Sequence, residues 1–372
     1  MKSTGLAQRI SYYVLSLFPA TYTGILFAFF VIGSVLSLGI PSMTVRTAIM
    51  VPIAWALVQS LGIEAQSKGS ALIILTTVEM AVVPGVGTLM GSLNGPVITA
   101  VFAQTKMAPI EFWDYVKVMA LPTFIICVLI ILINQILMKP DTPLKVGSGF
   151  VKQELKKLGP ITRNEVITGI IVLASIFMWA TAGPKNWQNI PSFVIGMIAL
   201  GLFGLTGIIK DSDIATGVSW TLLLFIGGVF SLAQVVDKQN IFKWIGGYFI
   251  PVATQMVSTP MLIIGTVTVA VLILRFVDPT GFLVIPVLFI PLVDLMMKAG
   301  FSPLVIVAPL TVASGPFFLS YQNFWIAMSE GLTGGKAYTD GQRMKLASAY
   351  AVIVLVVLTL SVVFWKMTGV IK

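Results

Sequence analysis

Two long apolar segments of this chain are each interrupted near the middle by a short polar cluster. The first cluster is Pro41-Ser42-Met43-Thr44-Val45-Arg46-Thr47, between the apolar residues 21–40 and 48–63. The second is Arg275-Phe276-Val277-Asp278-Pro279-Thr280-Gly281, between residues 261–274 and 282–297. Irregular backbone at membrane depth is tolerated only where protein buries it or where it lines a wet cavity. We therefore expect two helical hairpins whose tips form a binding site of the kind found in secondary transporters.

The composition is that of an all-α polytopic membrane protein. Hydrophobic residues make up 57% of the chain and charged residues only 10%, whereas soluble proteins carry about 25% charged residues. Apolar runs of about 20 residues, each long enough to span a bilayer as a helix, recur along the whole length. The alternating pattern of a membrane β-barrel is missing from the sequence.

Several kinds of site are excluded by residue type. The chain has no histidine and one cysteine, Cys127, so a His-ligated metal centre, a Ser-His triad and an internal disulfide cannot form. We expect neither an enzyme nor a cofactor, with Na⁺ as a possible coupling ion.

The net charge of +9 is interpreted as a record of topology and of contact with anionic lipid, and no nucleic-acid partner is expected. Residues 139–165 form the one sizeable hydrophilic segment and are rich in lysine. By the positive-inside rule this loop is predicted to be cytoplasmic, in a multi-pass protein of the inner or plasma membrane.

The order of segments repeats along the chain. Residues 1–20 are predicted to form an interfacial helix, and residues 21–138 a first repeat with a hairpin, a broken helix and a long helix. After the basic loop, residues 166–236 are predicted to form three scaffold helices, residues 237–258 a second interfacial helix, and residues 259–372 the second repeat. Three spans between the copies invert the second copy relative to the first, which gives an inverted repeat.

Both predicted broken helices are rich in glycine, proline and small polar residues. The first contains Pro84-Gly85-Val86-Gly87-Thr88 and Gly91-Ser92-Leu93-Asn94-Gly95-Pro96, and the second contains Ser314-Gly315-Pro316. Such runs cannot continue a helix, so we expect an unwound segment in the middle of each.

Three charged residues at membrane depth, Arg46, Asp278 and Glu79, each allow more than one interpretation. An intramembrane arginine is costly, so Arg46 either binds an anion or forms an ion pair with Asp278 or Glu79. Asp278 either satisfies Arg275, three residues away, or binds Na⁺ or a proton. Glu79 is either an ion-pair partner or a coupling carboxylate.

Three motifs resemble the divalent anion/sodium symporter family. Ser42-Met43-Thr44 is similar to the family's Ser-Asn-Thr signature, and Pro52 follows at the matching distance. The run Val86-Gly87-Thr88-Leu89-Met90-Gly91-Ser92 resembles the Gly-Thr-Leu-x-Gly-Ser/Thr run of the family's first broken helix. The chain departs from the family pattern in three places. Met43 replaces the signature asparagine, and Leu93-Asn94-Gly95 stands where Pro-Pro-Asn is usual. The second tip, near Asp278-Pro279-Thr280, lacks the Ser-Asn-Thr signature.

The resemblance implies an elevator-type carrier that binds a dicarboxylate or sulfate-like anion together with Na⁺ and works as a homodimer in the lipid bilayer. From the residues and the resemblance together, the predicted substrate-binding residues are Ser42, Thr44, Arg46, Asn94, Thr280 and Pro316. The predicted cation-binding residues are Ser42, Met43, Gly87, Thr88, Asp278 and Ser314. Glu79, Asp278 and Arg275 remain for ion pairing or coupling, and the coupling ion is either Na⁺ or H⁺.

Two other functions stay open. One is a cation/proton antiporter or arsenite-type exporter on the same scaffold, with Asp278 and Glu79 as the exchanging carboxylates. The other is a non-transporting fragment, because Thr4-Gly5-Leu6 resembles the stretch that directly precedes the family's first hairpin, so that the first scaffold helices would be missing.

Overall fold

The computed structural model describes residues 1–371 with several gaps. The residues outside the description are Lys2, Lys106, 142–143, 145–148, 183–189, many positions between 218 and 257, 279–280 and 282–283. The third scaffold helix expected at 218–236 and the interfacial helix expected at 237–258 lie largely in these gaps. Thr280 also lies outside the described residues.

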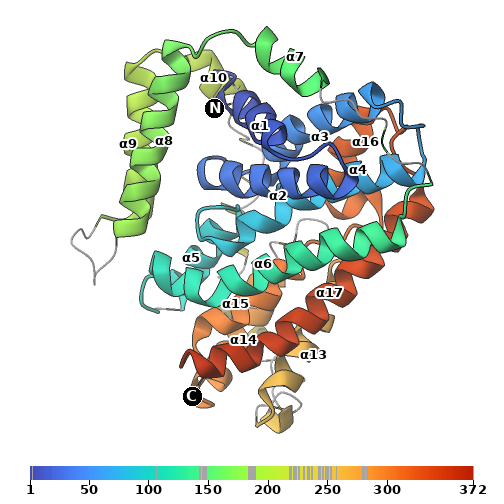
Figure 1. Ribbon diagram of the computed structural model, residues 1–372. Coiled ribbons are helices and arrows are strands. Elements are labelled where there is room, and N and C mark those ends of the chain that lie inside the picture. Colours follow the sequence, from blue (N-terminus) through green and yellow to red (C-terminus); the bar gives the residue numbers. More distant parts are fainter. Residues whose placement is uncertain are drawn as a thin grey trace.

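Six of the described helical segments are long and apolar enough to cross a membrane (Figure 1). They are α2 (Tyr22–Gly39), α3 (Met43–Ser60), α4 (Lys68–Val82) with the 3-10 turn η1 (Val83–Gly87), α6 (Phe112–Leu137), α8 (Arg163–Thr181) and α17 (Asp340–Met367). The described residues contain no strand apart from an isolated bridge between Phe301 and Ile371. The prediction of an all-α membrane protein is confirmed.

The first hairpin segment consists of two helices separated by three residues, after an initial helix α1 (Leu6–Leu17). Helix α2 ends at Gly39, and α3 begins at Met43. Pro41 has no N–H with which to continue α2, and the Ser42 hydroxyl caps α3 by accepting a hydrogen bond of 3.3 Å from the Val45 N–H. The break therefore lies where the polar cluster predicts it.

The next helix is broken as well. Helix α4 passes into η1, and residues 88–93 separate η1 from α5 (Asn94–Gln104). The backbone packs very closely here: a Cβ on Gly95 would lie 1.7 Å from the Leu89 carbonyl oxygen. Glycine is required for this approach, as the run of glycines indicates.

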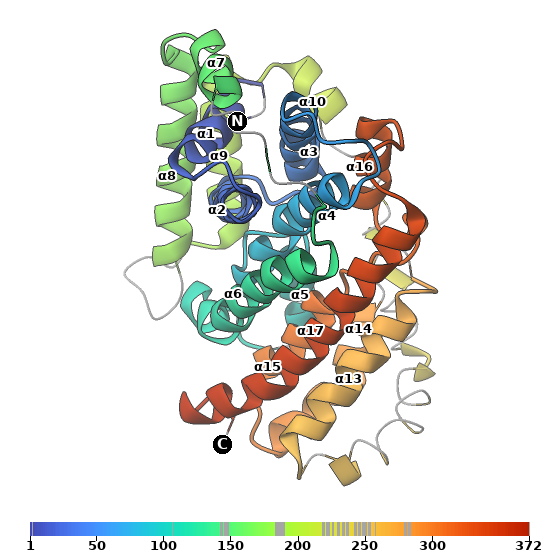
Figure 2. The same ribbon diagram turned by 45° about the vertical axis from the view of Figure 1, so that its right-hand side comes forward.

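The last part of the chain has the same order of elements. It contains α13 (Pro260–Leu274), α14 (Val284–Lys298), α15 (Pro303–Val312), the 3-10 turn η2 (Ser320–Gln322), α16 (Phe324–Thr333) and α17. In Figures 1 and 2, α13, α14, α15 and α17 lie together in one half of the molecule, and α2, α3 and α4 lie in the other. Helix α16 belongs to the last part of the chain but packs against α3 of the first part.

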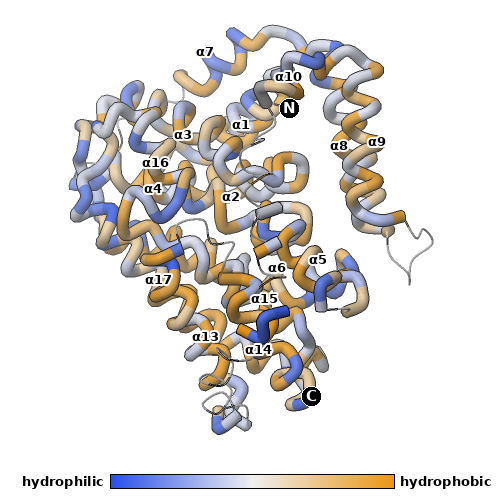
Figure 3. Tube along the Cα trace, turned by 180° about the vertical axis from the view of Figure 1, so that it is seen from behind, coloured by the Kyte–Doolittle hydropathy of each residue, from blue (hydrophilic) through white to orange (hydrophobic). Residues whose placement is uncertain are grey.

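The middle of the chain forms α7 (Gly149–Lys157), α8, α9 (Ser192–Leu205) and α10 (Asp211–Gly217). Helix α7 was not predicted, because residues 139–165 were expected to form only a hydrophilic loop. Helices α8 and α9 pack against each other and stand as a pair beside the main body (Figure 1). Hydrophobic residues dominate α9 and α15 (Figure 3).

Helix α4 forms the centre of the molecule. All of its residues from Gly69 to Val82 are buried, and it packs against α2, α3, α6 and α17. A helix that is apolar on every face is expected to be enclosed by other helices. The end of α4 therefore lies deep in the protein, where the chain unwinds.

Candidate functional site

Arg46 joins three stretches of backbone at the first helix break. Its fully buried guanidinium donates hydrogen bonds from Nε to the Ala81 carbonyl (2.5 Å) and from Nη1 to the carbonyls of Ile40 (2.6 Å) and Gly91 (2.8 Å). A longer bond runs from Nη2 to the Val82 carbonyl (3.4 Å). Helix ends leave such carbonyls without partners, so Arg46 satisfies the end of α2 and both sides of the first broken helix.

Arg275 does the same at the second break. It donates from Nε to the Ser314 carbonyl (2.7 Å) and from Nη2 to the Gln322 carbonyl (2.6 Å) and Asn323 Oδ1 (2.9 Å). It also donates from Nη1 to the Asp278 carbonyl. Arg275 therefore ties the second break to the unwound stretch between α15 and α16, as Arg46 ties the first break to the stretch between α4 and α5.

The contacts of Arg46 bear on both interpretations offered for it. The structure gives it no ion pair with Glu79 or Asp278, both of which are described residues. Its acceptors are backbone carbonyls, and these hydrogen bonds engage four of its five N–H groups. At most one N–H remains to reach a ligand, so Arg46 is not a free bidentate clamp.

Asp278 lies next to Arg275 and is buried. Its Oδ2 accepts a hydrogen bond of 3.2 Å from the backbone N–H of Val284, the first residue of α14. The carboxylate therefore sits at the positive end of a helix, where a negative charge is stabilised.

The break between α2 and α3 presents two hydroxyl groups at the start of α3. Ser42, Met43 and Thr44 are half-buried. The Ser42 hydroxyl caps the helix, and the contacts described for the chain include no hydrogen bond from the Thr44 hydroxyl. Thr44 can therefore bond to a ligand without losing a protein contact.

Buried hydroxyl groups without a partner mark the first unwound segment. Among the described residues, Thr88 Oγ1 and Ser92 Oγ are enclosed and make no hydrogen bond. Thr88 was predicted as a cation ligand, and Gly87 next to it is buried too. Ser92 was missed, although it ends the same motif. Asn94, the first residue of α5, is 7% exposed.

The second unwound segment is held by side chains that the sequence analysis did not single out. The Asn323 amide donates to the Pro316 carbonyl, and the Tyr350 hydroxyl donates to the Val312 carbonyl. Ser314, predicted as a cation ligand, is half-buried, and its hydroxyl donates to the Thr311 carbonyl (2.6 Å). Asn323 and Tyr350 give no local sequence signal, because their partners are backbone groups.

The first broken helix lies against helices of the second half of the chain. Turn η1 packs against α15, and the buried Tyr115 of α6 donates a hydrogen bond of 3.1 Å to the Val86 carbonyl of η1. Helix α5 packs against α14 in the same region. The fold therefore brings the first broken helix next to the second half of the chain, as a shared site requires.

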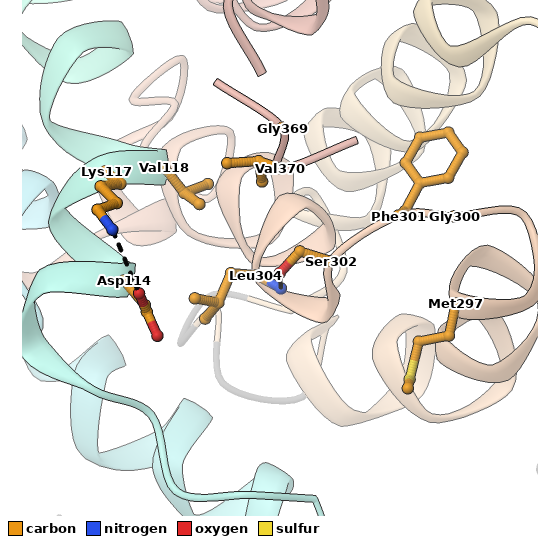
Figure 4. Close-up of a pocket in the computed structure, with 10 residues that line it drawn as sticks. All are labelled: Asp114, Lys117, Val118, Met297, Gly300, Phe301, Ser302, Leu304, Gly369 and Val370. Atoms are coloured by element: carbon orange, nitrogen blue, oxygen red, sulfur yellow. Dashed lines mark hydrogen bonds and ion pairs between the residues drawn. The ribbon is translucent and has the colours of Figure 1, made fainter. Parts of the chain in front are cut away.

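The structure also has an open cleft of about 410 Å³ elsewhere. It is lined by Asp114 and Lys117 of α6, by residues 300–302 and by Gly369 and Val370 (Figure 4). Asp114 and Lys117 form a loose ion pair of 3.8 Å. None of the predicted site residues lines this cleft, so it is separate from the two helix breaks.

Comparison with known proteins identifies relatives of the chain. Residues 1–371 match the family described as the sodium:sulfate symporter transmembrane region. The chain is 24% identical over 345 residues to the sodium-dependent dicarboxylate transporter SdcS of Staphylococcus saprophyticus, an alignment that covers 84% of this chain and 64% of that protein.

Two further relatives carry similar names. The chain is 26% identical over 271 residues to the SdcS protein of Staphylococcus aureus, with 66% of this chain and 52% of that protein covered. It is 22% identical over 248 residues to the chloroplastic dicarboxylate transporter 1 of spinach, with 65% and 43% covered. The matches thus span between 43% and 64% of the length of these relatives. Because the family match extends through nearly the whole chain, the chain belongs to the sodium:sulfate symporter transmembrane-region family, whose named relatives are transporters and not enzymes.

Proposed function

We propose that the protein carries a small dianion, a dicarboxylate or a sulfate-like ion, across the membrane together with Na⁺. The observation that carries this proposal is the matching pair of buried arginines, each of which holds a helix break against an unwound segment. Two such breaks provide helix ends, hydroxyls and carbonyls inside the membrane, which are the groups that transporters use for anions and cations. The names of the relatives favour a dicarboxylate.

The anion is proposed to bind at the tip of the first hairpin. Ser42 and Thr44 stand at the N-terminus of α3, where backbone N–H groups and the helix dipole attract negative charge. Arg46, in the first turn of α3, adds a positive charge and keeps the tip in place through its carbonyl contacts. Further contacts are proposed from Asn94, Pro316 and Thr280.

The cation is proposed to bind beside the anion, where oxygen atoms are available. Thr88 and Ser92 offer buried hydroxyls without partners, and Gly87 offers backbone beside them. Ser42 and Met43 lie at the adjacent tip. In the second half, Asp278 and Ser314 are the proposed counterparts. Unwound carbonyls and hydroxyls of this kind bind Na⁺ in other transporters.

An inverted repeat and an elevator motion are proposed on the basis of the repeated architecture. Each half has two helices around a break, then a helix with an unwound segment, then a long helix, and one arginine joins the parts in each half. A unit tied together in this way is suited to move as one body against the scaffold, which includes α8 and α9. A homodimer is proposed from the family resemblance.

Uptake by proteoliposomes tests the proposal. Proteoliposomes containing the protein are expected to accumulate labelled succinate when an inward Na⁺ gradient is applied, and to accumulate little without the gradient. Labelled citrate, sulfate and phosphate are tested in the same way. Failure with all four anions, with and without Na⁺, would contradict an anion carrier. Proton efflux on adding Na⁺ without any anion would instead favour the antiporter.

A further inference from the structure

Helix α4 carries one acidic residue, Glu79, at the centre of the molecule. Glu79 is 1% exposed and lies less than one turn before the helix passes into η1. Helix α4, which carries it, packs against α6 and α17 as well as against α2 and α3.

The Glu79 carboxyl group has one described hydrogen-bond partner, and that partner is uncharged. Its Oε2 lies 2.6 Å from the side-chain nitrogen of Asn134 on α6, and that nitrogen also lies 3.0 Å from Thr76 Oγ1. Among the described residues, Glu79 Oε1, Asn134 Oδ1 and Thr77 Oγ1 are buried without any partner. Glu79 forms no ion pair with any described residue.

The groups that face Glu79 from the surrounding helices do not supply a compensating charge. Cys127 of α6 and Tyr350 of α17 are buried, and a thiol and a phenol ordinarily carry no charge at neutral pH. Arg46 of α3 is bonded to the Ala81 and Val82 carbonyls. The acid on α16, Glu330, pairs with Arg343, α2 contributes no charged residue, and η1 contributes none.

An ionised carboxylate enclosed in this way without a cation is very costly, and such groups become neutral instead. The 2.6 Å separation from Asn134 is also the ordinary length of an O–H···O bond. The two ends of an amide are assigned from its hydrogen bonds. With the Asn134 amide rotated by 180°, its oxygen would accept a hydrogen bond from the protonated carboxyl group.

The helices around Glu79 are hydrogen-bonded to residues at both unwound segments. Ala81 and Val82, two and three residues further along α4, accept hydrogen bonds from Arg46 at the first break. Tyr350 lies on α17, which also packs against α4, and its hydroxyl donates to the Val312 carbonyl at the end of α15. A movement that displaces either unwound segment would therefore shift the helices that enclose the carboxyl group.

We propose that Glu79 and Asn134 form a proton-binding site, which keeps its proton while α4 and α6 enclose it and exchanges it with water when these helices separate. The site binds a proton and not Na⁺, because it offers only a few side-chain oxygens. The exchange during a transport cycle rests on the proposed function, whereas the protonation of Glu79 does not.

Infrared spectroscopy of the reconstituted chain, without substrate, tests the site. The parent protein should have a protonated-carboxyl C=O band at about pH 7, where exposed acids with ordinary pKa values of about 4 are ionised. The band should be lost in Glu79→Gln and kept in the control Glu64→Gln, which changes an exposed acid. It should shift in Asn134→Leu, and it should disappear from the parent as the pH is raised.

Four results of the infrared experiment would overturn the proposal. A band that survives in Glu79→Gln belongs to another acid, and absence of the band at about pH 7 means that Glu79 is ionised. A band that persists at every pH at which the protein stays folded marks a permanently neutral, structural acid. A band that disappears on adding Na⁺ at constant pH marks a Na⁺ site. Since no substrate is used, these results do not depend on whether the protein transports succinate.

Discussion

The guanidinium of Arg46 donates a hydrogen bond of 2.8 Å to the carbonyl of Gly91, which lies 45 residues further along the chain. The same side chain binds Ile40 and Ala81. Unpaired backbone inside a membrane is unstable unless protein groups satisfy it, and here one side chain satisfies carbonyls from three segments. Arg275 has the equivalent role in the second half.

Arg46→Ala is expected to destabilise the protein strongly. The substitution leaves several buried carbonyls without donors, and each buried unsatisfied group costs about 1–3 kcal/mol. Arg46→Lys should recover only part of the loss, since an ammonium group cannot reach carbonyls in a planar fork. Thermal unfolding in detergent measures both, with the exposed Arg163→Ala as control. An Arg46→Ala protein with an unchanged unfolding temperature would show that the carbonyl contacts do not stabilise the fold.

Gly85→Ala is expected to disrupt the first unwound segment. A Cβ at this position would lie 2.2 Å from the Gly91 carbonyl oxygen and 2.5 Å from Arg46 Nη2, so the backbone must move. Overpacking of this kind costs about 1–3 kcal/mol or more. Gly341→Ala is the matched control, because its Cβ meets nothing within 4 Å and alanine favours the helix. Equal unfolding temperatures for the two variants would contradict the close packing at Gly85.

The ion pair between Arg9 and Glu165 is expected to stabilise the contact of α1 with α8. Arg9 Nε lies 2.7 Å from Glu165 Oε1, with the two side chains 15% and 3% exposed. A double-mutant cycle to alanine should give a coupling energy of about 1–3 kcal/mol. The pair of Lys68 and Asp141 is a suitable comparison, because it is 52% and 74% exposed and such pairs contribute about 0–1 kcal/mol. Similar coupling energies in the two cycles would contradict this difference.

The helix breaks could be predicted from the sequence because their causes are local. Pro41 and the closely spaced Gly85, Gly87 and Gly91 disfavour a regular helix, and the Ser42 hydroxyl caps the next helix through a local hydrogen bond. The unpredicted α7 has no such marker, because a short polar helix differs little in composition from a polar loop. Its existence depends on packing against α1.

The contacts of the site could not be predicted in the same way. The partners of Arg46 and Arg275 are mainly backbone carbonyls, which every residue has, so no residue type identifies them. Asn134 and Tyr350 lie in long, mostly apolar helices, and only the tertiary fold places them beside Glu79 and Val312. The sequence marks Arg46 and Arg275 as charged residues that are costly to bury in a membrane. It does not show which groups accept their hydrogen bonds.

The central claim, that the tip of the first hairpin binds a dianion in a Na⁺-dependent way, is tested most directly by initial rates of Na⁺-driven succinate uptake in Thr44→Val. The hydroxyl of Thr44 makes no described hydrogen bond within the protein, so the variant should fold normally. Loss of one hydrogen bond to a charged ligand, worth about 1.5–3 kcal/mol, should raise the KM for succinate by at least tenfold. Thr99→Val, on the exposed face of α5, should leave the KM unchanged. A folded Thr44→Val protein with the parent KM would contradict the claim.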